Sequence, residues 1–127
     1  MGHDRSYELF FWRQEAMMPV SSRAIYDALC DGRPVDGLAP LPLDGLIAGV
    51  MASFPTSRRA PDRAELVEWR ADNGEDAFEV TWSTQHLRVD CWHLGESDVT
   101  IFVELAASFG CPLYDPQSGQ RSRLRAP

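Results

Sequence analysis

The stretch Phe109-Gly-Cys-Pro-Leu-Tyr-Asp-Pro-Gln-Ser-Gly119 holds a helix stop, a short strand and a tight turn in close succession. An apolar, helix-like run precedes it, and Gly110 is suited to end that helix. Residues 111–114 are typical of a short buried strand, and the Asp-Pro-Gln-Ser-Gly segment at 115–119 predicts a turn into solvent. This arrangement predicts a local topology and supplies no chemistry by itself.

The elements upstream of this stretch follow from hydrophobic spacing. Residues 7–13 are apolar on both alternating sets, which predicts a central strand covered on both faces. Ser21 or Ser22 caps a first helix that Gly32 ends, a second helix spans 43–54, and a third begins at Ser97 or Asp98. Further strands are expected at 66–70, 78–83 and 87–91.

The order β-α-α-β-β-β-α-β predicts an α+β fold, a mostly antiparallel sheet with helices packed on one face. We expect a single domain over residues 1–127, with a disordered polar tail at about 120–127. Gly45 and Gly49 lie one turn apart on the second helix, where glycine costs helix stability. A closely packed neighbour is therefore expected beside them.

Two turns predict the pairing of the strands between residues 66 and 91. Asn73-Gly74 is a strong hairpin signal, and a second turn at Thr84-Gln85 would place Glu79 opposite Asp90. The clean alternation of these strands predicts a sheet face that is not covered by helices. Opposed carboxylates repel one another, so this face either awaits a cation from a partner or is neutralised by Arg88 or Arg70.

Charge narrows the classes of partner. The chain has a net charge of −7 and no lysine, and the residues up to Asp115 carry 19 acidic residues against 9 arginines, a balance of 9 − 19 = −10. Such a field repels nucleic acid and attracts basic proteins. No apolar run approaches the roughly 20 residues of a membrane span, and the charged N-terminus is unlike a signal peptide, so we expect a cytoplasmic protein.

The cysteines and histidines do not suggest a metal site. Cys30, Cys91 and Cys111 form no Cys-x-x-Cys pair. Strand alternation directs Cys91 and His93 inward and His86 outward, so their side chains would not converge. No phosphate-binding loop or hydrolase elbow occurs, and we expect neither a metal nor another cofactor.

Three segments together resemble a group of bacterial proteins. Tyr7-Glu8-Leu9, Phe78-Glu-Val-Thr-Trp-Ser83 and the 109–119 stretch with its Tyr-Asp-Pro-Gln turn resemble the small acidic immunity proteins of polymorphic-toxin and contact-dependent competition systems. The resemblance implies a non-catalytic protein that neutralises a cognate toxin by covering its active site. It brings no catalytic residues to this chain.

The expected contact residues for such a toxin are acidic or polar groups at three places: the 71–76 turn, the open sheet face and the final turn. They are Asp72, Glu75, Asp76, Glu79, Asp90, Asp115 and Gln117. An acidic surface would speed encounter with a basic toxin such as a nuclease. For Asp115, a purely structural role in the turn is the alternative.

Two other functions remain open at this point. One is a small enzyme that uses Cys91, His93 or a carboxylate pair in a pocket. The other is a homo-oligomer, such as a homodimer, formed through the open sheet face or a strand edge.

Overall fold

The computed structural model describes residues 6–14 and 17–121. Its helices are α1 (Ser22–Cys30), α2 (Leu43–Ser53) and α3 (Glu96–Ser108). Its strands are β1 (Ser6–Phe11), β2 (Arg13–Gln14), β3 (Leu38–Ala39), β4 (Arg58–Arg59), β5 (Leu66–Arg70), β6 (Ala77–Trp82), β7 (Leu87–Trp92), β8 (Leu113–Asp115) and β9 (Gln120–Arg121). The predicted α+β class and the order of the longer elements are confirmed.

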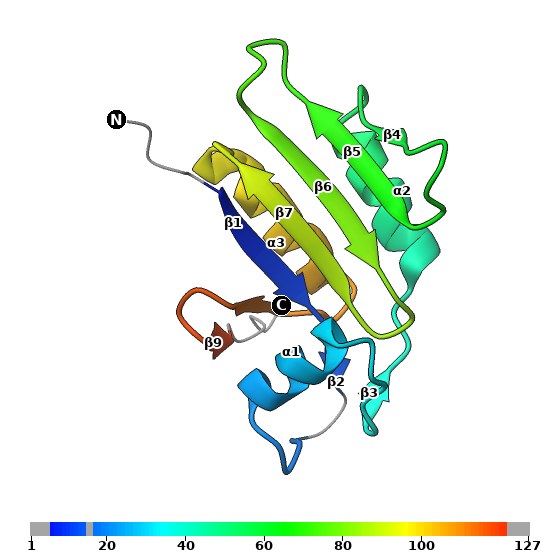
Figure 1. The fold of residues 1–127 in the computed structure, drawn as a ribbon, viewed down its shortest axis with the longest axis vertical. Helices are drawn as coiled ribbons and strands as arrows, with labels where there is room; N and C mark the ends of the chain where they lie inside the picture. The colour runs from blue at the N-terminus through cyan, green and yellow to red at the C-terminus, as the bar shows by residue number, and fades with distance from the viewer. Residues whose placement is uncertain (1–5, 15–16, 122–127) are drawn as a thin grey trace.

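The main sheet has seven strands in the order β4-β5-β6-β7-β1-β8-β9, and β2 pairs with β3 in a small second sheet (Figure 1). All pairings among the described strands are antiparallel. β1 lies between β7 and β8, which confirms its predicted central position. The predicted strand at 7–13 is divided, because the chain leaves the main sheet after Phe11 and pairs with β3 from Arg13.

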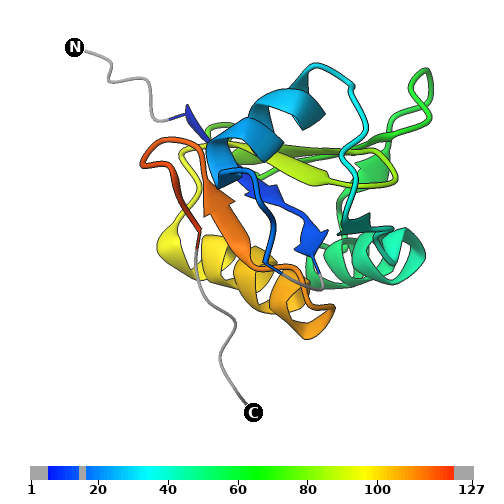
Figure 2. The same ribbon diagram turned by 90° about the horizontal axis from the view of Figure 1, so that it is seen from below.

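One face of the main sheet, the inner face, is covered by α2 and α3 (Figure 2). Alternate residues of β1, β6 and β7 point into this layer and are buried, among them Phe11, Phe78 and Val89. Phe102 and Ala106 of α3 are buried against them, as the spacing of that helix predicts. This layer holds the larger hydrophobic core.

The opposite face, which we call the outer face, is partly covered by α1. The expectation that the helices pack on one face therefore holds for α2 and α3 and not for α1. The reason lies in the second apolar set of the N-terminal segment: Phe10 and Trp12 are fully buried on this side together with Tyr114. Ile25 and Leu29 of α1 supply the apolar cover that these aromatic rings require.

The two hairpins have the predicted register. Glu79 pairs with Asp90, Thr81 with Arg88, and Phe78 with Cys91. The turn before β6 has Gly74 at φ 75°, a left-handed conformation in which glycine carries no Cβ penalty.

The contact between α2 and α3 explains the two glycines of α2. A Cβ atom at Gly45 would lie 2.7 Å from the Phe109 ring, and one at Gly49 would lie 2.5 Å from Leu105 Cδ1. Both distances are far below a normal carbon contact. The predicted close neighbour is therefore confirmed.

The C-terminal elements differ from the predictions at their boundaries. The last strand covers 113–115 instead of 111–114, although Cys111 and Tyr114 are buried as expected. The last helix is capped by Gly95, whose carbonyl accepts from Asp98 and Val99, and not by Ser97 or Asp98. Residues 120 and 121, which were expected to belong to a disordered tail, form β9 and pair with β8; residues 122–127 lie outside the described part of the chain.

Candidate functional site

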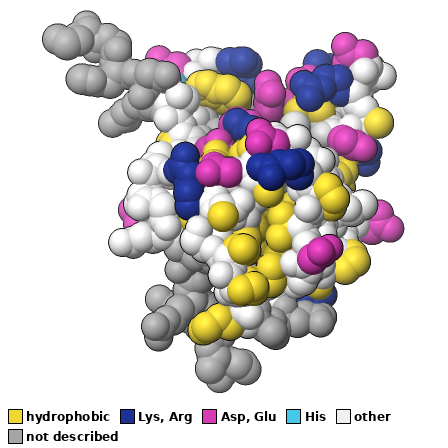
Figure 3. All heavy atoms as spheres, turned by 60° about the horizontal axis from the view of Figure 1, so that its bottom comes forward, with side chains coloured by type: hydrophobic (Ala, Val, Ile, Leu, Met, Phe, Trp, Pro, Cys, Tyr) yellow, Lys and Arg dark blue, Asp and Glu magenta, His cyan; other side chains and the backbone are white. Residues whose placement is uncertain are grey.

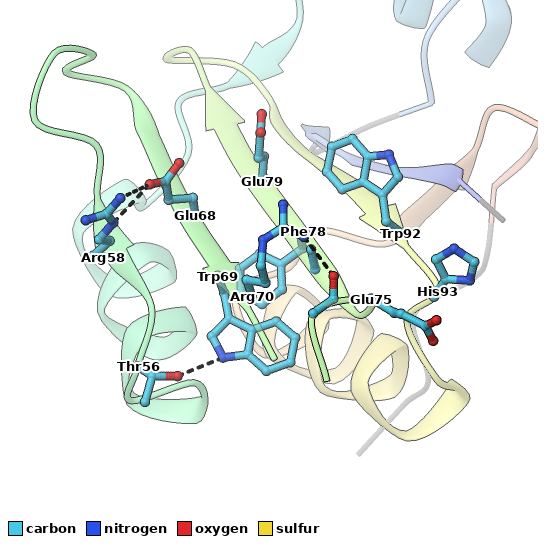
Figure 4. A pocket seen from close by; sticks show the side chains of 12 residues that line it. Thr56, Arg58, Glu68, Trp69, Arg70, Glu75, Phe78, Glu79, Trp92 and His93 are labelled. Atoms are coloured by element: carbon cyan, nitrogen blue, oxygen red, sulfur yellow. Dashed lines mark hydrogen bonds and ion pairs between the residues drawn. The ribbon is translucent and has the colours of Figure 1, made fainter. Parts of the chain in front are cut away.

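The part of the outer face that α1 leaves open carries a cleft of about 800 Å³ over β5, β6 and β7 (Figure 4). Outward-facing residues of these strands form one part of its wall, and the turn between β5 and β6 contributes Gly74 and Glu75. The cleft also reaches inward-facing groups near this turn, since Trp69, Phe78 and Thr56 line it too. The lining residues are Thr56, Arg58, Glu68, Trp69, Arg70, Gly74, Glu75, Ala77, Phe78, Glu79, Trp92 and His93.

A row of four carboxylates crosses this face. Glu68 of β5 pairs with Glu79 of β6, Glu79 pairs with Asp90 of β7, and Asp90 pairs with Glu8 of β1. Directly opposed residues have Cβ atoms about 5 Å apart, so neighbouring members of the row repel one another. Antiparallel register alone brings together four acids that are far apart in the sequence.

Arginines compensate both ends of the row. Arg58 Nη2 lies 2.8 Å from Glu68 Oε1 at one end. At the other end Arg88 Nη2 lies 3.2 Å from Asp90 Oδ1 and 3.3 Å from Glu8 Oε1. Figure 3, which shows the side where α1 lies, likewise has acidic and basic side chains next to one another. The outer face is thus a mixed-charge surface. Arg88 neutralises Asp90, as expected from the hypothesis that an arginine of the sheet itself compensates these carboxylates.

The Glu8 end of the row is half-buried beneath α1. Tyr26 of α1 donates a 2.9 Å hydrogen bond to Glu8 Oε2. Burial raises the pKa of Glu8 above its usual value, although this hydrogen bond and Arg88 act in the opposite direction. Glu8 therefore ties α1 to the sheet and is a supporting residue of the face.

Glu79, in the middle of the row, makes no ion pair within 4.0 Å with any residue that the structure describes, although Arg70 lines the same cleft. Arg70, the second arginine proposed to neutralise this pair, donates instead to the Gly74 carbonyl at 3.0 Å. Of the predicted contact residues, Glu79 is the one whose position most clearly suits a partner's cation.

The acidic turn is only partly directed at the cleft. Glu75 lines it, whereas Asp72 and Asp76 are not among the lining residues. Asn73 Oδ1 accepts from the backbone N–H groups of Glu75 and Asp76 at 2.8 and 3.0 Å, which holds the turn in shape. The structure therefore brings Glu75 and Glu79 into one cleft, places Asp90 opposite Glu79 on the sheet, and leaves Asp72 and Asp76 outside the lining of the cleft.

The last two predicted residues have structural roles. The Gln117 amide accepts from Glu8 N at 2.6 Å and donates to Glu8 O at 3.0 Å, so it pairs with β1 much as a strand residue does. Asp115 Oδ1 accepts from the backbone and side chain of Gln117, and its other oxygen accepts from Ser118. Slight burial acts to raise the pKa of Asp115, but these hydrogen bonds outweigh it and the pKa is lowered. The structural alternative for Asp115 thus matches the observed turn.

A smaller cavity of about 290 Å³ adjoins the cleft beside β1. Asp90, Trp92 and Gln117 line it together with Glu8 and Tyr7. Trp92 lines both hollows, so the open surface continues from β4 to the last turn.

The cysteine and histidine side chains do not form a reactive group. Alternation predicts an inward His93, but β7 ends at Trp92, and His93 takes a φ of 54° and is exposed. Cys91 is fully buried, and burial raises the pKa of its thiol to about 12. The Cys91 thiol is therefore protonated at neutral pH. Within residues 6–14 and 17–121, no three His, Cys, Asp or Glu side chains are arranged to hold a metal ion.

The predicted residues omit several members of the face: Arg58, Glu68, Arg70, Trp92 and Glu8. Glu68 and Trp92 could have been found from the strand pattern, since both alternate with buried inward residues. Arg58 could not, because β4 is two residues long and its pairing with β5 has no signal in local sequence.

Searches against protein-family models and against curated protein sequences find no match for this chain. In the described part of the chain the longest helix, α3, has 13 residues, and no helix there combines the length and hydrophobicity of a membrane crossing.

Proposed function

We propose that the protein is a non-catalytic, cytoplasmic binding protein that neutralises a cognate bacterial toxin domain by covering its active site. The observation that carries this proposal is the open outer face, with its cleft and with Glu79, which makes no ion pair in the described chain. An open sheet face with a cleft lined by charged and aromatic side chains is suited to receive a protein surface.

The charge pattern supports a protein partner over a nucleic acid. The chain is acidic overall, which favours encounter with a basic surface and opposes the approach of phosphates. Arg58 and Arg88 already neutralise the ends of the carboxylate row, so only the central position is left for an incoming cation.

An enzyme remains the second candidate class, and its carboxylate-pair form has a candidate site, because Glu68 and Glu79 lie opposite one another and both line the cleft. Cys91 is a protonated, buried thiol and His93 points elsewhere, so the proposed nucleophile pair is not assembled. A homodimer through the open face is an alternative use of the same surface.

The test is neutralisation of a toxin encoded beside this gene. Co-expression of the full chain should restore growth to cells that make the toxin, and the purified proteins should form a complex of fixed stoichiometry. Glu79→Arg should abolish protection, whereas Asp62→Arg, which makes the same charge change at an exposed loop position, should not. A gene with no toxin-like neighbour, or a monomeric chain that leaves such a neighbour fully active, would contradict the proposal. Light scattering that shows a stable homodimer through this face would support the alternative.

A further inference from the structure

We infer that the cleft recognises one arginine side chain of the partner protein, held between the Glu79 carboxylate and the Trp92 indole. This inference rests on the proposed function, since it names the group that the same face would bind.

Trp92 differs from the other tryptophans in its surroundings. Trp12 Nε1 donates to Gln14 and Trp69 Nε1 donates to Thr56, each at 2.9 Å. The Arg59 guanidinium lies 5.2 Å from the centre of the Trp82 ring. Within the described part of the chain, Trp92 has no such hydrogen bond, ring contact or cation, although it lies on a polar surface. An indole with a free face and a free N–H is typical of an interface residue.

The register leaves room beside this indole. The residues directly opposite Trp92 are Ala77 on one side and Ser6 on the other, both small. Glu79 follows Ala77 by two residues on β6, so its side chain is on the same face and is the diagonal neighbour of Trp92. Long side chains can bridge this spacing. Both residues line the cleft, and Figure 4 shows their side chains on the same side of the sheet.

A guanidinium fits this pair better than an ammonium does. It is planar and weakly hydrated, so it can lie on the indole face while its N–H groups bind the carboxylate. Glu75 also lines the cleft and adds a second negative charge, which offsets the positive charge of Arg70, held on the Gly74 carbonyl in the same cleft. An arginine–indole contact already occurs elsewhere on this sheet, where Arg59 lies over the Trp82 ring.

The experiment uses capped five-residue glycine peptides with a central arginine, citrulline or lysine, added to the full-length protein at low salt. The Trp92 indole N–H resonance, assigned with Trp92→Phe, reports binding. We expect the arginine peptide to shift this resonance and to bind about tenfold more tightly than the uncharged citrulline peptide. Glu79→Gln should weaken binding about tenfold, whereas Asp62→Asn, an equal charge change at an exposed loop position, should leave it unchanged.

Three results would each overturn the inference: the citrulline or lysine peptide binds as tightly as the arginine peptide, Glu79→Gln has no effect on binding, or free arginine binds more tightly than the arginine peptide. The last result would point to a small-molecule ligand. Thermal unfolding of Glu79→Gln separates a lost contact from a lost fold. If the arginine peptide binds as described and no toxin is neutralised, the proposed function fails alone. If a toxin is neutralised and the peptides are not distinguished, this inference fails alone.

Discussion

At the scale of single residues, His86 shows how a polar residue packs against the core beneath the outer face. Its ring stacks on Phe10 at 4.9 Å with the planes 6° apart, and its Nδ1 lies 2.7 Å from Ser83 Oγ. Burial, and then the nearby Arg88, lower the pKa of His86 from 6.5 to about 4. The ring is therefore neutral at pH 7 in the folded protein.

This lowered pKa predicts a loss of stability in acid. Between pH 6.5 and 4 the unfolded chain binds a proton at His86 that the folded chain does not, so stability falls as the pH falls through this window. The contribution is at most about 3 kcal/mol, and less because the ring is partly exposed. His86→Phe keeps the stacking and removes the titration. Urea unfolding at several pH values should show a flatter profile for this variant; parallel profiles would show that His86 does not titrate in this way.

The three cysteines should differ in reactivity. Cys30 is exposed, whereas Cys91 and Cys111 are fully buried. In the native protein we expect a thiol reagent at mildly alkaline pH to modify Cys30 first, and the other two only after denaturant is added. Cys30→Ser should remove the fast phase. Rapid modification of Cys91 in that variant would mean that the thiol is accessible and would reopen the enzymatic alternative.

At the scale of elements, the contact between α2 and α3 depends on missing side chains. Gly49→Ala adds about 1 kcal/mol of helix propensity, but its Cβ would lie 2.5 Å from Leu105 Cδ1. We expect a net destabilisation of about 1–2 kcal/mol in chemical unfolding. In a Leu105→Ala background the same substitution should become neutral or stabilising. A Gly49→Ala effect that is identical in both backgrounds would show that this contact does not set the helix spacing.

The carboxylate row makes a prediction about the sheet. Glu79 lies between Glu68 and Asp90 without a counter-charge of its own in the described chain. Glu79→Gln should therefore stabilise the free protein by about 0.5 kcal/mol while it weakens binding. Asp72→Asn, on the exposed turn, should change stability little. A destabilised Glu79→Gln would mean that the carboxylate has a structural partner, and the case for a binding role would be lost.

At the scale of the whole molecule, the net charge of −7 acts over distances longer than any one contact. With a basic partner we expect the association rate to fall about tenfold or more between low and high salt, while the dissociation rate changes less. Stopped-flow mixing of the protein with its cognate toxin at several salt concentrations measures the association and dissociation rates. A rate that is independent of salt would mean that the acidic surface does not guide encounter.

Much of the fold could be predicted because its signals are local. The alternation in residues 78–91 and the turn at Thr84-Gln85 were enough to place Glu79 opposite Asp90. The spacing of α2 and its glycines likewise predicted a close neighbour, though not that Leu105 of α3 and Phe109, just after that helix, would be that neighbour.

The sequence by itself determined the class of fold, the helices and longer strands, and the pairing within each hairpin, because side-chain period and turn chemistry act over a few residues. Only the tertiary structure decided that β1 lies between β7 and β8, that α1 packs on the outer face, and that Glu68 and Glu8 extend the Glu79–Asp90 pair into a row. Those arrangements depend on contacts between segments far apart in the chain. Burial of Phe10 and Tyr114 against α1 selects which segments pack together, and the local sequence pattern carries no information about that choice.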